Sequence, residues 1–245
     1  ILRSNRWNGG PIMSNPNKSI VVPCIDIQGG EVVQLVQGRK RALVGPEPLE
    51  MIRRFEGFPE IQVIDLDAAM GKGDNAKIIE MLASRAVCRV GGGVRTPERA
   101  KQLVEMGAHR VIVGTAAFQP NFSNIVETVG KDRVIVALDS KAGSVVVDGW
   151  DTSLDASAED ILPSFIDRCN GFLCTYVDKE GMMQGTDLDW FARLRSLTSL
   201  PVTAAGGITT LQDVAALLAL NIDAAVGMAV YTGALPLSRL RELSV

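Results

Sequence analysis

The sequence predicts an α/β protein, specifically a (β/α)8 TIM barrel built from two duplicated half-barrels. Three observations support this fold class. Apolar runs of strand length alternate with amphipathic helical segments about eight times after Ser19. Most of these runs are apolar throughout, as is typical of parallel strands that are buried on both faces. Parts of the first half also recur in the second half, which indicates an internal repeat.

The elements follow in order along the chain. We expect strands at residues 20–25, 62–66, 87–90, 110–113, 134–138, 172–176, 202–204 and 224–226. Thr96, Pro97 and Glu98 form a helix start, with an N-cap, a proline at the first helical position and an acid in the first turn. Gly107 is expected to end that helix. Thr210 and Asp213 predict another helix start of the same kind.

The repeat keeps an almost constant spacing of 113 residues. The segment VVPCIDIQGGEVV from Val21 matches VIVALDSKAGSVVV from Val134, which pairs Asp26 with Asp139. GGVRT from Gly92 matches GGITT from Gly206, and VGTAA matches VGMAV. A duplicated half-barrel explains all three matches together.

Composition excludes several classes of function. The chain has 245 residues, 47% of them hydrophobic, and a net charge of −3, so it lacks the basic surface of a nucleic-acid-binding protein. Its single histidine, His109, precedes an apolar strand, which excludes a His-rich metal site and argues against a Ser-His-Asp triad. The four cysteines, Cys24, Cys88, Cys169 and Cys174, show no CxxC spacing and are expected to be buried thiols.

The same features give the domain organisation and location. We expect residues 1–18 to be a disordered leader and residues 19–245 to form one barrel domain. No apolar run approaches the length of a membrane span, and no signal peptide is evident. The prediction is therefore a cytoplasmic monomer that binds neither nucleic acid nor membrane.

Two aspartates are the candidate catalytic residues. Asp26 and Asp139 are predicted to end the first and fifth strands, on opposite sides of the barrel mouth. Active sites of these barrels lie at the carboxyl ends of the strands. Two facing carboxyl groups can divide the work, one as acid and the other as base.

Glycine turns predict the kind of ligand. Gly93 and Gly207 follow the third and seventh strands, and Gly114-Thr115 and Gly227-Met228 follow the fourth and eighth. Backbone N–H groups in such turns bind phosphate without a basic side chain. Two opposed pairs predict a ligand with a phosphate at each end.

Thr175, on the sixth strand, offers the site a hydroxyl, or it only fills the strand. Trp150, after the fifth strand, stacks on a planar heterocycle or only packs its loop.

These segments resemble a known family. IVVPCIDIQGGEVVQLVQG, VIDLDAA, VGGGVRTPE, VIVGTAAF, ALDSKAGSVVVDGW, CTYVDKEGMMQGTD, AAGGITTLQD and VGMAVYTG are similar, in this order, to segments of the ProFAR isomerases (HisA) of the HisA/HisF family of histidine biosynthesis. The resemblance covers residues 20 to about 233. It implies an aldose–ketose isomerase that carries out an Amadori rearrangement of ProFAR, a substrate with two phosphates. It implies no metal and no organic cofactor.

The resemblance also implies roles for individual residues. Asp26 would be the base that moves the C2′ proton, Asp139 the acid that opens the ribose ring, and Thr175 an assisting group. Trp150 would pack on the imidazole carboxamide. One phosphate would lie at Gly93, Gly114 and Thr115, and the other at Gly181, Gly207, Gly227 and Met228.

Three positions depart from the family pattern. Members commonly have Arg where this chain has Gln34, an acidic residue in place of Tyr176, and Asp-Gly in place of Glu180-Gly181. We expect all three changes to lie on the catalytic face and to alter rate and substrate range rather than reaction class. Three alternatives stay open: an isomerase that also accepts phosphoribosylanthranilate, a HisF-like cyclase, and a phosphate-binding barrel with impaired catalysis.

Overall fold

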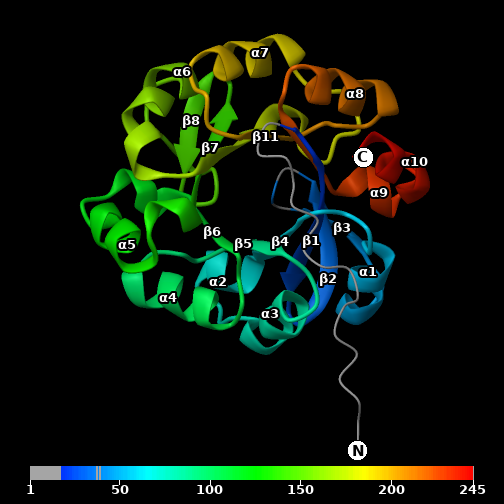
Figure 1. The fold of residues 1–245 in the computed structure, drawn as a ribbon, viewed down its shortest axis with the longest axis horizontal. Helices are drawn as coiled ribbons and strands as arrows, with labels where there is room; N and C mark the ends of the chain where they lie inside the picture. The colour runs from blue at the N-terminus through cyan, green and yellow to red at the C-terminus, as the bar shows by residue number, and fades with distance from the viewer. Residues whose placement is uncertain (1–17, 37, 39, 245) are drawn as a thin grey trace, which may run out of the picture.

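The computed structural model describes residues 18–36, 38 and 40–244, and its central feature is a closed barrel of parallel strands (Figure 1). Each barrel strand pairs with the next, and the last pairs with the first. In order they are β1 (Val21–Gln28), β4 (Ile61–Asp65), β5 (Cys88–Gly91), β6 (Arg110–Val113), β7 (Val134–Lys141), β10 (Gly171–Tyr176), β11 (Val202–Ala205) and β12 (Asp223–Val226). The predicted (β/α)8 barrel is confirmed.

Helices surround the barrel in the sequence order of a TIM barrel, as Figure 1 shows. The α-helices are α1 (Pro48–Arg54), α2 (Leu66–Met70), α3 (Ala76–Ala83), α4 (Pro97–Glu105), α5 (Phe122–Val129), α6 (Ala158–Ile161), α7 (Leu188–Ser196), α8 (Leu211–Ala219), α9 (Met228–Tyr231) and α10 (Leu237–Leu243). The 3-10 helices are η1 (Thr115–Phe118), η2 (Lys131–Arg133), η3 (Leu162–Arg168) and η4 (Val177–Lys179).

Both predicted helix starts are present. The Thr96 hydroxyl accepts a hydrogen bond from the Arg99 N–H, and α4 begins at Pro97. Thr210 and Asp213 form a capping box, in which each side chain accepts from the backbone N–H of the other. Gly107 lies one residue past the C-cap of α4 and adopts a φ of 104°, which suits glycine.

The duplication is visible in two antiparallel hairpins that extend from the barrel. β1 continues into β2 (Glu31–Val36) and β3 (Lys40–Val44), while β7 continues into β8 (Ser144–Val147) and β9 (Thr152–Ser153). Asp26 lies opposite Val33, and Asp139 lies opposite Val146. The expectation that the two aspartates end their strands is wrong, because hairpin pairing extends both strands two residues further.

The barrel interior has an apolar layer above a polar one. Ile112, Ile135, Ala137 and Leu173 form a buried cluster inside the barrel, separate from the larger core between strands and helices. Below it, at the amino ends of the strands, the Arg89 guanidinium contacts Glu60, Asp223 and Thr203. This end of a TIM barrel serves stability, which leaves the opposite end for the ligand.

Other predicted features take their expected places. All four cysteines are buried and free, and His109 is exposed just before β6. Across residues 18–36, 38 and 40–244, every helix is too short or too polar to cross a membrane. The predicted leader lies outside the described residues, apart from Lys18.

Candidate active site

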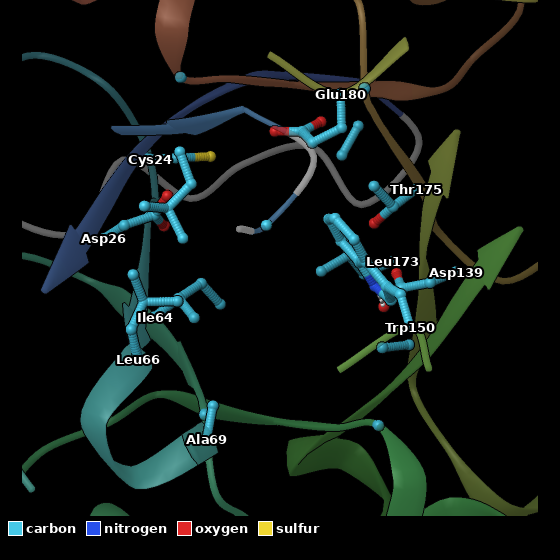
Figure 2. A pocket seen from close by; sticks show the side chains of 18 of the residues that line it. Cys24, Asp26, Ile64, Leu66, Ala69, Asp139, Trp150, Leu173, Thr175 and Glu180 are labelled. Carbon is cyan, nitrogen blue, oxygen red and sulfur yellow. Dashed lines mark hydrogen bonds between the residues drawn. The ribbon is translucent and has the colours of Figure 1, made fainter. Parts of the chain in front are cut away.

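A cavity of about 350 Å3 opens at the carboxyl ends of the barrel strands. Every site residue predicted from the sequence lines it: Asp26, Gly93, Gly114, Thr115, Asp139, Trp150, Thr175, Gly181, Gly207, Gly227 and Met228. Figure 2 shows Asp26 and Asp139 on opposite sides of this cavity. The structure thus brings together residues from all parts of the chain, as the duplication requires.

Asp26 has an apolar neighbour on the adjacent strand. In the register of β1 and β4, Asp26 lies beside Ile64, which has no hydrogen-bonding group. Within the described part of the chain, no donor reaches its carboxylate. Burial raises the pKa of Asp26 to about 7, because a low-dielectric surrounding disfavours the charged form. A carboxylate with this pKa is suited to act as a general base near neutral pH.

Asp139 occupies the equivalent position in the second half but has different neighbours. Its partner in register is Thr175, and Thr175 and Trp150 both give it a side-chain hydrogen bond. The Trp150 Nε1 donor lies 2.8 Å from Oδ2 of Asp139. Burial raises the pKa of Asp139, while these two hydrogen bonds oppose the rise. Asp139 is therefore oriented directly through its carboxylate.

A third carboxyl group, Glu180, lines the same cavity; it lies near the top of the view in Figure 2, with Asp26 below it on one side and Asp139 below it on the other. Burial, and then the charges of Asp26 and Asp139, raise the pKa of Glu180 to about 8. Glu180 therefore carries a proton at neutral pH. Its departure from the family pattern was noted in the sequence, but its place between the aspartates was not, because its counterpart in the first half is Ala69, which has no polar group.

The glycine pairs after β5 and β11 allow two loops to lie against neighbouring backbone. A Cβ on Gly92 would lie 2.1 Å from the Asp65 carbonyl oxygen, and one on Gly206 would lie 2.4 Å from that of Tyr176. Gly93 and Gly207 have φ values of 67° and 74°. The two turns are thus equivalent, and both require glycine.

The turns after β6 and β12 are equivalent as well. Gly114 precedes η1 and Gly227 precedes α9, and their carbonyls accept from Ala117 at 2.8 Å and Val230 at 2.9 Å respectively. The first N–H groups of such turns have no partner inside the turn, so they are free to bind an anion at the rim. Thr115 also accepts from the Asp148 N–H, at 2.9 Å, which ties this rim to the loop after β8.

Three polar residues of the cavity were not among the predicted site residues. Arg95 is the one basic side chain of the described residues that lines the cavity, and its guanidinium donates to the carbonyls of Ala68 and Ala69. Gln34 and Gln62 are buried. The Gln62 Oε1 atom has no partner among the described residues. Gln34 therefore lies on the catalytic face, as expected from the sequence. Sequence reasoning missed Arg95 because its counterpart in the repeat, Thr209, is not basic, and it missed Gln62 because this residue lies within a strand.

Tyr176 corrects one expectation, because it is not on the catalytic face. It is absent from the cavity lining, and its ring packs on Trp190 of α7, with ring centroids 5.7 Å apart. In the first half its counterpart is Asp65, which is fully buried and accepts hydrogen bonds from Asn75 and the Ala68 N–H. Tyr176 and its counterpart Asp65 therefore both have structural roles.

The loop that carries Trp150 is strained. Asp148, Gly149 and Trp150 are consecutive left-handed residues, with φ values of 54°, 69° and 72°. This conformation costs a residue with a side chain about 1–2 kcal/mol. A Cβ on Gly38 would lie 2.6 Å from the Trp150 ring, so the first and fifth loops are in close contact. The contact with Gly38 and the hydrogen bond to Asp139 hold the indole over the cavity in spite of this cost.

The fold and the site together define a class of protein: (β/α)8-barrel enzymes with facing carboxyl groups and a rim in which the same glycine turns occur twice. Comparison with known sequences gives the family. The model of the family described as "Histidine biosynthesis protein" matches residues 20–236. The chain belongs to this family.

Individual relatives agree along most of their length. A protein of Methanocaldococcus jannaschii is 36% identical over 91% of this chain and 98% of its own. One of Methanopyrus kandleri is 40% identical over 80% and 85%, and one of Thermus thermophilus is 34% identical over 91% and 98%. All three are named 1-(5-phosphoribosyl)-5-((5-phosphoribosylamino)methylideneamino) imidazole-4-carboxamide isomerase, which is ProFAR isomerase.

Proposed function

We propose that this protein is an aldose–ketose isomerase of histidine biosynthesis, which converts ProFAR into the aminoketose PRFAR. The observation that carries the proposal is the pair of differently tuned carboxyl groups, Asp26 and Asp139, facing each other across one cavity. Its rim repeats the same glycine turn on two opposite sides. The relatives' name contains two phosphoribosyl groups, and two such turns fit a ligand with a phosphate at each end.

The chemistry needs one acid and one base. An acid first protonates the ring oxygen of the aminoaldose, which opens the ribose and leaves a protonated imine at C1′. A base then takes the proton from C2′, and the electron pair of that C–H bond forms an enamine. Return of a proton to C1′, with loss of the C2′ hydroxyl proton, gives the aminoketose. Protons are moved and none is consumed overall.

The environments of the carboxyl groups suggest how these tasks are divided. Asp26, free of donors from the described residues, is the base. Asp139 and Glu180 together supply the acid, because burial, and then the charges of Asp26 and Asp139, raise the pKa of Glu180 and leave one proton for the pair at neutral pH. Thr175 and Trp150 hold Asp139 in place toward the substrate.

This division predicts a narrow bell-shaped dependence of kcat/KM on pH. Activity should fall below about pH 7 as Asp26 gains a proton, and above about pH 8 as the Asp139–Glu180 pair loses its proton. Glu180→Gln should move the basic limb to lower pH, because the remaining acid, Asp139, has hydrogen bonds that favour its charged form. The measurement is kcat/KM of wild type and variant from pH 5.5 to 9.5.

Glu180→Asp is the matched control, since it keeps the charge and shortens the side chain by one methylene. It should keep the basic limb and change turnover, because a shift of ~1 Å can cost on the order of 10²-fold in rate. If the basic limb of the Glu180→Gln variant stays at the wild-type pH, Glu180 is not part of the group that acts as the acid. Melting temperatures should stay close to wild type in both variants.

The two rim turns predict two anion sites. Crystals grown with sulfate should show one ion near Gly93, Gly114 and Thr115 and a second near Gly207, Gly227 and Met228, each bound by backbone N–H groups. The family resemblance adds Gly181 to the second site, and Gly181 lines the same cavity. An ion at the second turn alone would instead favour a substrate with one phosphate, such as phosphoribosylanthranilate.

Genetic complementation tests the proposed function. The wild-type gene should restore growth without histidine to a strain that lacks ProFAR isomerase, and the Asp26→Asn variant should not. If the gene also restores growth without tryptophan to a strain that lacks phosphoribosylanthranilate isomerase, phosphoribosylanthranilate is a second substrate. Failure of the well-expressed wild type to restore growth without histidine would contradict the proposal.

A further inference from the structure

The two halves of the barrel hold their aspartates by different means. Asp139 is fixed through its carboxylate by Trp150 and Thr175. Asp26 has no such donor among the described residues, and Ile64 stands where the second half has Thr175. A group that must accept a proton is best left without donors on its oxygens, because donors stabilise the charged form. Its position must then come from the backbone of β1.

The backbone of β1 lacks support from β12 at this level. The ladder between the two strands ends at the pair of Pro23 and Val226, because β12 turns away at Gly227. Pro23 also has no N–H to donate. The Cys24 carbonyl, two residues before Asp26, therefore lies just beyond the last paired residue of this ladder.

Tyr231 supplies the missing donor. Its hydroxyl lies 2.9 Å from the Cys24 carbonyl oxygen and donates to it. Burial, and then the nearby Asp26 and Cys24, raise the pKa of Tyr231 well above its usual value, so the hydroxyl keeps its proton. The ring is fixed as well, because a Cβ on Gly45 would lie only 2.9 Å from its Cε1 atom.

The duplication shows that this hydroxyl is specific to one half. The counterpart of Tyr231 is Phe118, which has no hydroxyl and packs edge-on against Phe165, with ring centroids 5.6 Å apart. The carbonyl equivalent to that of Cys24 belongs to Ala137, beside the aspartate that already has its own two donors. The tyrosine thus occurs only beside the aspartate that lacks direct donors.

We propose that Tyr231 is a positioning residue, whose hydroxyl fixes β1 at Cys24 and so aims the Asp26 carboxylate at the substrate proton. This inference rests on the proposed function, in which Asp26 is the base. Tyr231 lies outside the cavity lining, so its effect reaches the substrate only through β1.

Tyr231→Phe tests the inference, and Tyr176→Phe is its matched control. The chain has two tyrosines, and the hydroxyl of Tyr176 lies away from the cavity. Tyr231→Phe should lower kcat for ProFAR by on the order of 10 to 10²-fold and leave KM close to wild type, since small misplacements of a reacting group cost rate. Tyr176→Phe should keep wild-type kcat.

A double-mutant cycle separates positioning from a general structural effect. In the Asp26→Asn background, Tyr231→Phe should cause no further loss, because the residue it positions is already inactive. If the Tyr231→Phe variant does not fold, Gly45→Ala replaces it, because the added methyl group displaces the Tyr231 ring without removing its hydroxyl. Gly45→Ala should then lower kcat in the wild-type background and cause no further loss in the Asp26→Asn background. Wild-type kcat in Tyr231→Phe, or an equal loss in the Asp26→Asn background, would overturn the inference. Conversion by wild type and its loss in Asp26→Asn test the proposed function separately.

Discussion

Asp26→Asn and Asp139→Asn should each lower kcat for ProFAR isomerisation by about 10²–10⁴-fold, the usual contribution of a positioned proton-transfer group. Asn is nearly the same size as Asp but cannot take up a proton at neutral pH. KM should change little, because the phosphates bind at the glycine turns rather than at these carboxyl groups. The measurement is steady-state kinetics with purified proteins of confirmed fold.

The two substitutions should differ in stability. Asp139→Asn can keep a hydrogen bond from Trp150 through its amide oxygen, so the loop after β8 should stay in place. Asp26→Asn removes a buried carboxyl group with a raised pKa, which should stabilise the fold slightly at high pH. Near-normal kcat in either variant would contradict its role in the mechanism.

Arg89→Met should produce the largest loss of stability, about 3–5 kcal/mol in the free energy of unfolding. Arg89 is 2% exposed, and its guanidinium pairs with Glu60 at 2.6 Å and Asp223 at 3.4 Å. Methionine fills similar space but leaves two buried carboxylates with one remaining guanidinium, that of Arg110. Urea unfolding at pH 7.5 measures the difference.

The pH dependence identifies the cause of this loss. In the wild type, burial opposes the ionisation of Glu60, but the charges of Arg89 and Arg110 together outweigh this effect and lower the pKa of Glu60. Burial already raises the pKa of Asp223 in the wild type, although Arg89 opposes the rise. Without Arg89, the pKa of Glu60 in the folded state should rise above its unfolded value, and that of Asp223 should rise further. Such groups stabilise the fold at low pH and lose that contribution as pH rises. The deficit of Arg89→Met should therefore be smaller at pH 5 than at pH 8.

Arg54→Met is the control for charge removal. Arg54 forms an ion pair with Glu50 on the exposed face of α1, where such pairs contribute less than about 1 kcal/mol. If Arg89→Met costs no more than Arg54→Met, the buried network does not stabilise the barrel.

The fold could be predicted because most barrel strands are apolar over most of their length and several helices carry clear start signals. The ends of β1 and β7 were predicted too early, because a polar residue after an apolar run was taken as the end of the strand. Tight two-residue turns at 29–30 and 142–143 instead carry each strand into a local hairpin with β2 or β8. Asp26 and Asp139 were found because the duplication marks them twice.

The same duplication explains what was missed. Glu180 lines the cavity, as expected from the sequence, but its place beside both aspartates was not predicted. Because Asp26 pairs with Ile64 and Asp139 pairs with Thr175, the counterpart of Glu180 in the repeat is Ala69, so no second copy draws attention to it. Its raised pKa depends on burial and on two charges brought close only by folding. Tyr176 was misplaced because a departure from a family pattern does not reveal which way a side chain points. Its counterpart, the buried Asp65, would have indicated a structural position.

The most direct test of the account is incubation of the purified wild-type protein with ProFAR, with separation of ProFAR from PRFAR by chromatography because the isomers have equal mass. The account predicts enzymatic conversion without added metal or cofactor, lost in Asp26→Asn and Asp139→Asn and kept in Tyr176→Phe. A folded wild-type protein that binds ProFAR but forms no PRFAR would contradict it.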